Sequence, residues 1–227
     1  RQITGTTSMT AEFADDGRVL VYEGPRIETF APGAELPARE LRAVRLDDAT
    51  AEPRRMCARS AAMVRRDGQT LHARLAAAGD RVVLELVAED SCGVVDAWEL
   101  PTAERWSDPD CAATTCVIAR YADHHVELWT LPPGAPPVRV SRVEAPAASY
   151  PPSVALSPDA RRAIVLPRDG ASGPGTVLVI PLDGGALARF DVLGIQAVVW
   201  SAEPDHVYIS GRGIDGHHNP VLRMSIT

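Results

Sequence analysis

The 227-residue chain contains no lysine, and all 23 of its basic residues are arginine. It has a single asparagine, Asn219, and only three phenylalanines. The codon usage of a GC-rich genome, which favours Arg, Ala, Pro and Gly, explains this bias without a functional cause. The lack of lysine excludes a phosphate-binding loop at residues 213–216, because such a loop needs that side chain.

Three further absences exclude classes of function. The formal net charge of −7 argues against a general nucleic-acid binder, since phosphate contacts need a basic surface. No apolar run approaches the length of a membrane span, and no stretch is typical of a signal peptide. There is also no G-x-S-x-G nucleophile motif. We therefore expect no nucleic-acid partner and no direct membrane insertion of this segment.

The sequence does contain 45% hydrophobic residues, 19 prolines and 17 glycines, which favours an all-β chain with many turns. The clearest unit runs from residue 156 to 190, and its first strand begins just before it. Short apolar runs at 154–156, 163–166, 177–180 and 186–190 predict four strands, because the breaks between them carry turn-forming Pro, Asp and Gly. A lone four-stranded meander buries too little surface to be stable, so it must stack on copies of itself.

Copies of this unit recur along the chain. The first hairpin of the unit, an acidic turn between two apolar runs, aligns with residues 11–24, 75–90 and 197–213. Residues 116–141 match the second, third and fourth strands of the unit. Third-strand phrases also match one another; they are found at 41–47, 94–101, 126–132, 177–183 and 221–227. Five third strands predict five units.

The units resemble the WD-like repeat of TolB-type β-propellers, whose signature is S-P-D-G followed by a strand. Ser157-Pro158-Asp159 matches this signature with Ala160 in the place of the glycine, while 15–17 and 203–205 match in part. The resemblance implies a closed ring of meanders and no particular chemistry.

We therefore predict a single all-β domain over residues 1–227, a β-propeller of about five four-stranded blades. The last blade is expected to be closed by the N-terminal strand, residues 1–6. The alternative is a piece of a longer propeller. The expected blades cover approximately 7–56, 57–106, 107–147, 148–193, and 194–227 together with 1–6.

The four cysteines, Cys57, Cys92, Cys111 and Cys116, do not have the spacing of a paired-CxxC zinc site. Cys111 and Cys116 are close enough to close a small loop as a disulfide. An even count fits an exported domain, periplasmic or extracellular, and it also fits four reduced thiols in a cytoplasmic protein.

Two loops carry adjacent histidines beside a carboxylate: Asp123-His124-His125 and Asp215-Gly216-His217-His218. Loops that join second to third strands or successive blades emerge on one face of a propeller; here they are 23–39, 88–94, 121–125, 168–175 and 211–220. One interpretation is a shared metal or general-base site. The other is surface histidines in polar loops, and we expect no metal and no cofactor.

Two further features bear on binding. The long loop 23–39 contains Phe30 and Leu36, which predict a partner-binding flap or a cover over the channel. Trp98 and Trp129 fall at matching places in the third-strand phrases, which favours packing between blades over stacking on a carbohydrate.

The preferred hypothesis is a non-enzymatic binding module, an exported or sensory domain of a larger bacterial protein, acting as a monomer. It would engage a protein, peptide or small ligand on its loop face. The alternative is a glycosidase-like hydrolase that uses loop-face carboxylates such as Glu89, Asp90, Asp123 and Asp215.

Overall fold

The computed structural model describes residues 11–14, 19–25, 39–48, 50, 52, 54–55, 62–101, 106–112, 114–132, 134–145, 148, 150–168, 174–193, 195–211 and 221–226. The regular elements in these ranges are β-strands joined by turns. No helix in this part of the chain is long and apolar enough to cross a membrane.

The described strands form five antiparallel sheets, and within each sheet they follow one another in chain order. The first sheet contains β1 (Ala11–Ala14), β2 (Val19–Pro25), β3 (Arg39–Arg45) and β4 (Arg54–Arg55). The second contains β5 (Met63–Arg66), β6 (Gln69–Ala78), β7 (Arg81–Ala88) and β8 (Val94–Leu100). The third contains β9 (Asp110–Ala112), β10 (Thr115–Ala122), β11 (His125–Leu131) and β12 (Val138–Glu144). The fourth contains β13 (Tyr150–Leu156), β14 (Arg162–Arg168), β15 (Pro174–Pro181) and β16 (Ala188–Leu193). The fifth contains β17 (Ile195–Trp200), β18 (His206–Gly211) and β19 (Val221–Ser225).

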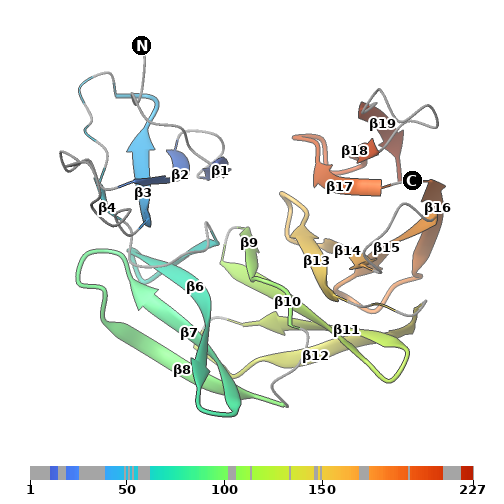
Figure 1. Cartoon of the computed structure of the whole chain (residues 1–227), viewed down its shortest axis with the longest axis horizontal. Coiled ribbons are helices and arrows are strands. Elements are labelled where there is room, and N and C mark those ends of the chain that lie inside the picture. Colours follow the sequence, from blue (N-terminus) through green and yellow to red (C-terminus); the bar gives the residue numbers. More distant parts are fainter. Residues whose placement is uncertain are drawn as a thin grey trace, which may run out of the picture.

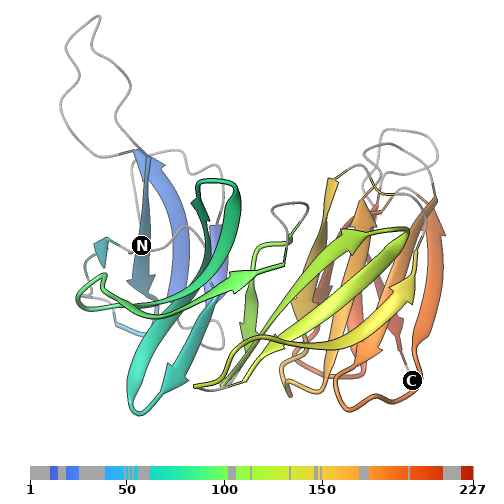
Figure 2. The ribbon, with the colours of Figure 1, turned by 90° about the horizontal axis from the view of Figure 1, so that it is seen from below.

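The five sheets lie in chain order around an arc, with β9, β13 and β17 on its inner side (Figure 1). Figure 2 shows the third and fourth sheets side by side. This arrangement of meanders confirms the predicted β-propeller class. The arc stays open between the first and fifth sheets, unlike the closed ring that the resemblance implies (Figure 1). The closing strand predicted at residues 1–6 lies outside the described residues.

In the second sheet, the strands are shifted by one from the assignment that the repeat pattern predicts. That pattern predicts its first hairpin turn at Gly79-Asp80, whereas the structure has this turn at Asp67-Gly68 and uses Gly79-Asp80 for the second hairpin. Asp67 and Gly68 both have positive φ, 52° and 79°, and an Asp-Gly pair strongly favours such a type I′ turn. The phrase 94–101 is therefore a fourth strand, and its assignment as a third strand is wrong.

This shift changes the meaning of the tryptophans. Trp98 lies on β8, a fourth strand, while Trp129 lies on β11, a third strand, so their predicted equivalence is wrong. Both nevertheless pack against the same apolar cluster between the second and third sheets. The packing role is confirmed, although the repeat does not explain it.

Three apolar clusters hold the second to fifth sheets together. Each cluster fills one junction between the faces of two neighbouring sheets, which we call a seam. Successive residues of a strand point to opposite faces. From β10, Cys116 and Ile118 therefore enter the seam with the second sheet, and Val117 and Ala119 enter the seam with the fourth. The central strands are buried on both faces.

The S-P-D segment is a hydrogen-bonded turn between β13 and β14. The buried Ser157 Oγ donates to Asp159 Oδ1 at 2.6 Å and accepts from the backbone amides of Arg161 and Arg162 at 3.2 and 2.9 Å. Ala160, in the place of the signature glycine, has φ 55°, which explains why glycine is favoured there. Burial raises the pKa of Asp159, but the hydrogen bonds from Ser157 and Arg161 outweigh it and hold that pKa below its usual value.

Polar contacts also cross the seam between the fourth and fifth sheets. Trp200 Nε1 donates to the carbonyl oxygen of Ala155 at 2.9 Å. Arg162 Nη2 donates to Pro204 O and to Asp205 Oδ1, both at 2.6 Å, while its guanidinium lies 5.6 Å from the centre of the Trp200 ring. These bonds fix the orientation of the fifth sheet on the fourth.

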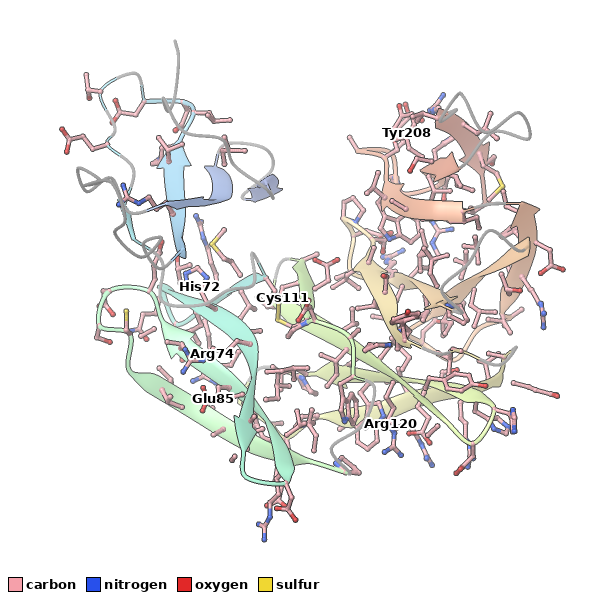
Figure 3. All side chains as sticks on the ribbon, viewed as in Figure 1. His72, Arg74, Glu85, Cys111, Arg120 and Tyr208 are labelled. Carbon is pink, nitrogen blue, oxygen red and sulfur yellow. A yellow bond between two sulfur atoms is a disulfide. The ribbon has the colours of Figure 1, made fainter. Side chains whose placement is uncertain are left out.

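The opposite face of the fifth sheet is apolar and exposed. Val199 and Tyr208 pair across β17 and β18 on this face, and Val221 on β19 lies on the same side. Their exposed fractions are 55%, 39% and 66%. Tyr208 marks this sheet in Figure 3. The exposure follows from the open arc, because no described sheet packs against this face.

We expect Ser157→Ala to destabilise the protein by about 1–3 kcal/mol, because the partly buried Arg162 amide loses its bond to the hydroxyl and the Arg161 amide keeps only its bond to Asp159. Urea unfolding at neutral pH measures the change. Ser91→Ala is the matched control, since the exposed Ser91 Oγ accepts only a 3.3 Å bond from the Gly93 amide. The control should change stability by no more than about 0.5 kcal/mol. Equal effects of the two substitutions would contradict the role given to Ser157.

Candidate functional site

Asp123, His124 and His125, predicted as ligand residues, form the hairpin turn between β10 and β11. Asp123 and His124 have φ of 50° and 62°, the conformation of a type I′ turn, and Ala122 pairs with His125 across it. The Nδ1–H of His125 donates to the carbonyl oxygen of Asp123 at 2.6 Å. The Asp123 carboxylate is 89% exposed and lies 4.0 Å from Arg142 Nη2. This geometry favours the interpretation of surface residues in a polar turn.

The other predicted ligand residues, Asp215, His217 and His218, lie outside the described residues, as do the flap residues Phe30 and Leu36. A site shared by the two histidine loops therefore stays a prediction. In the described part of the chain, no group of three or more His, Cys, Asp or Glu is placed to hold a metal ion.

One of the predicted loop-face segments is misplaced. The 88–94 loop joins β7 to β8, the third and fourth strands of its sheet, and not a second to a third strand. In a meander, such a loop leaves the sheet at the end opposite to second-to-third turns such as the Asp123 turn. Glu89 and Asp90 therefore do not share a face with Asp123.

Cys111 and Cys116 form a disulfide between β9 and β10, at directly opposed positions with their Cα atoms 4.0 Å apart. Cys92 is also disulfide-bonded. Cys57 lies outside the described residues, and none of the cysteines within them is free. The alternative of reduced thiols therefore does not apply to these three cysteines.

A small, partly open cavity lies between the inner strands of the fourth and fifth sheets. Its lining consists of Ser153, Val154 and Ala155 of β13, Ala197 and Val198 of β17, and Ile164 and Leu166 of β14. Its volume is about 190 Å³, and Ser153 supplies its one polar side chain. Sequence reasoning missed this cavity, because its two strands are some forty positions apart and each resembles an ordinary first strand.

A cluster of charges, which we call the Glu127 cluster, lies on the face of the third sheet that is turned to the second. The side chain of Glu127 is 3% exposed. Its Oε2 accepts a hydrogen bond from Arg120 Nε at 2.6 Å and its Oε1 accepts one from Arg139 Nη1 at 3.0 Å, while Arg142 Nε lies 3.8 Å from Oε1. The carboxylate thus ties β10 and β12 together across β11.

The arginines set the charge state of Glu127. Burial raises the pKa of its carboxyl, but the hydrogen bond and charge of Arg120 and the charge of Arg139 outweigh this effect, and the pKa lies below its usual value. Arg120 also donates to Pro101 O at 2.9 Å and lies over the Trp106 ring at 5.4 Å. Every contact of this carboxylate is internal, which indicates a structural role.

Comparisons with known proteins identify the fold. No protein-family model matches the chain, and no curated protein matches it. TolB from Acinetobacter baumannii aligns with 97% of this chain at 12% identity and a TM-score of 0.62, over 52% of its own length. A puromycin-hydrolyzing peptidase from Mycobacterium tuberculosis aligns with 98% at 16% identity and a TM-score of 0.57, over 37% of its own. Kuenenia stuttgartiensis hydrazine synthase aligns with 97% at 12% identity and a TM-score of 0.56, over 72% of its chain.

These likenesses confirm the resemblance to TolB-type propellers at the level of the fold. The chain spans about half the length of TolB and a smaller share of the peptidase. Because the identities are so low, the activities of these proteins do not transfer to this chain.

We expect Glu127→Gln to lower stability by about 1–3 kcal/mol at neutral pH, because charge-assisted hydrogen bonds at a buried carboxylate are lost. The folded-state pKa of Glu127 is depressed, so its contribution is present above the unfolded-state value of about 4.3 and fades as the pH falls through the folded value. Urea unfolding from pH 7 down to pH 3 should show wild type and variant converging at the acid end.

Glu99→Gln is the matched control. Glu99 also sits on a strand and accepts from Arg81 at 2.9 Å, but the two side chains are 58% and 62% exposed. An exposed ion pair of this kind contributes at most about 1 kcal/mol. A Glu127→Gln effect that stays constant down to pH 3 would contradict the assigned pKa shift.

Proposed function

We propose that this chain is a non-enzymatic β-propeller module that binds a protein or peptide partner through the cavity between β13 and β17. Sites for small molecules commonly enclose about 300–1,000 Å³. The cavity encloses about 190 Å³, the share of roughly six water molecules in the liquid. This volume suits one aliphatic side chain better than a whole cofactor or sugar.

The chemistry of the cavity supports an extended peptide as the partner. Burying one Leu or Ile side chain among aliphatic walls contributes about 1.5–3 kcal/mol. The backbone of β13 borders the cavity, and Leu156 N donates away from β14, to a neighbouring sheet. Val154, two positions earlier, therefore also directs its N–H and C=O away from β14. A peptide strand that pairs with this edge would place every second side chain toward the cavity.

The disulfides support export. Structural disulfides form and persist in oxidising compartments. We therefore propose a periplasmic or extracellular location, with the chain acting as a monomeric binding or sensory part of a larger bacterial protein. Its alignment with half the length of TolB is compatible with a larger parent protein.

The hydrolase alternative gains no support from the described residues. Glycosidase chemistry needs two carboxylates that face one scissile bond. Glu89 and Asp90 emerge at the end of the second sheet opposite to the Asp123 turn, so these three do not converge. Glu127 is enclosed by arginines and does not reach solvent.

A peptide-display selection on the immobilised protein tests the proposal. We expect enrichment of extended peptides with one large aliphatic residue at a fixed position. Ala155 lines the cavity and pairs with Ile164, whose side chain lies in this seam, so Ala155→Leu fills the cavity and should weaken the selected peptides at least tenfold, about 1.4 kcal/mol. Ala186→Leu, at an exposed turn residue away from the cavity, is the control and should bind like wild type.

Two results would contradict the proposal. Selected peptides that bind Ala155→Leu as tightly as wild type would remove the cavity from the binding site. Turnover of fluorogenic glycoside or peptide substrates that is lost in Asp123→Asn would favour the hydrolase instead.

A further inference from the structure

We propose that the Cys111–Cys116 disulfide is a redox-sensitive latch on the seam between the third and fourth sheets. The oxidised form holds β9 on β10, and β9 in turn bonds to β13. Reduction frees β9 at its turn end and loosens that seam from its inner side.

The disulfide lies beside the first hairpin turn of its sheet. In the fourth sheet, Ser157 N donates to Arg162 O at 2.8 Å at this place, and Ser201 makes the same kind of contact in the fifth sheet at 2.9 Å. Each of these contacts encloses four residues, and in the third sheet the pair that encloses four residues is Cys111 and Cys116, with Ala112 and Thr115 paired inside it. A covalent bond therefore stands where the neighbouring sheets use hydrogen bonds.

The third sheet needs this bond more than its neighbours do. β9 has three residues, whereas β13 has seven and β17 has six. Residues 112–115 read Ala-Ala-Thr-Thr and lack the S-P-D hydroxyl and carboxylate that close the turn before β14. Upstream, Ser107 N donates to Ala119 O at 2.7 Å, which anchors the start of the segment. The turn end of β9 is therefore held by the pairing of Ala112 with Thr115 and by the disulfide.

Asp110 couples this strand to the next sheet. It precedes Cys111 on β9, and its Oδ2 accepts a hydrogen bond from the backbone amide of Leu156 at 2.6 Å. Leu156 is the last residue of β13, and β9 packs against both β13 and β5 of the second sheet. A displacement of β9 therefore breaks a charge-assisted bond between two sheets.

The two sulfurs differ in access. Cys111 is partly exposed on the inner side of the arc, where Figure 3 labels it, while Cys116 is 1% exposed. A dithiol thiolate attacks Sγ of Cys111 and displaces the Cys116 thiolate, which takes up a proton. The second thiol of the reductant then displaces Cys111 from the mixed disulfide. Two electrons and two protons pass to the protein, and the reductant leaves as a disulfide.

The short loop indicates that the disulfide acts locally and contributes little to the stability of the whole fold. A disulfide stabilises a fold mainly by restricting the unfolded chain, and the restriction grows with the length of the closed loop. Cys111 and Cys116 are only five positions apart, so this loop is near the minimum. The main effect of the bond is expected locally, in β9 and at the Leu156 amide.

Hydrogen exchange with residue resolution tests the latch. We expect reduction of the native protein with a dithiol, or the Cys111→Ala/Cys116→Ala variant, to raise the exchange rate of the Leu156 amide at least tenfold. The amides of Val207 and Ile209, which belong to the fourth-to-fifth seam, serve as the internal control and should keep their rates. Mass spectrometry after alkylation identifies which cysteines have been reduced.

Asp110→Ala is the second variant, because it cuts the link to Leu156 while leaving the disulfide in place. It should raise Leu156 exchange alone and leave the amides of β9 and β10 protected. If the double variant does not fold, the reduced wild-type protein provides the same comparison. Unchanged Leu156 exchange after confirmed cleavage would overturn the latch, and so would an equal rise throughout the chain.

Discussion

The rest of the structure depends on the face-to-face packing of neighbouring sheets, because the central strands bury side chains on both of their faces. Val117 and Ile118 are adjacent on β10, yet each is almost fully buried in a different seam. A sheet taken from the arc would expose both of its apolar faces. The neighbouring sheets are therefore expected to fold together and not one by one. Their packing also holds the loops and turns in place.

Each seam also has a polar contact that sets how its sheets meet. Arg120 donates to Pro101 O between the second and third sheets, Asp110 accepts from Leu156 between the third and fourth, and Trp200 donates to Ala155 between the fourth and fifth. The last contact fixes the spacing of β13 and β17. The aliphatic cavity proposed as the binding site lies between these strands, so it is a property of the seam and not of any loop.

The sequence predicts local features well and long-range ones poorly. The four strands between 150 and 193 follow from alternating apolar runs and turn residues, and the close spacing of Cys111 and Cys116 suggests the disulfide that the structure contains. The Asp67-Gly68 turn is a strong local signal, and it places the strands of the second sheet one position away from the assignment that the repeat pattern predicts. Glu127 carries no signal of its own, because its burial depends on arginines that reach it from two other strands.

Native-state hydrogen exchange under low concentrations of denaturant tests the dependence on the seams most directly. Strands that share a seam should open together, so amides of β10, β11, β14 and β15 should exchange with one common free energy and one common denaturant dependence. Separate opening energies for the third and fourth sheets, each with its own denaturant dependence, would show that the sheets are independently stable and would contradict the account.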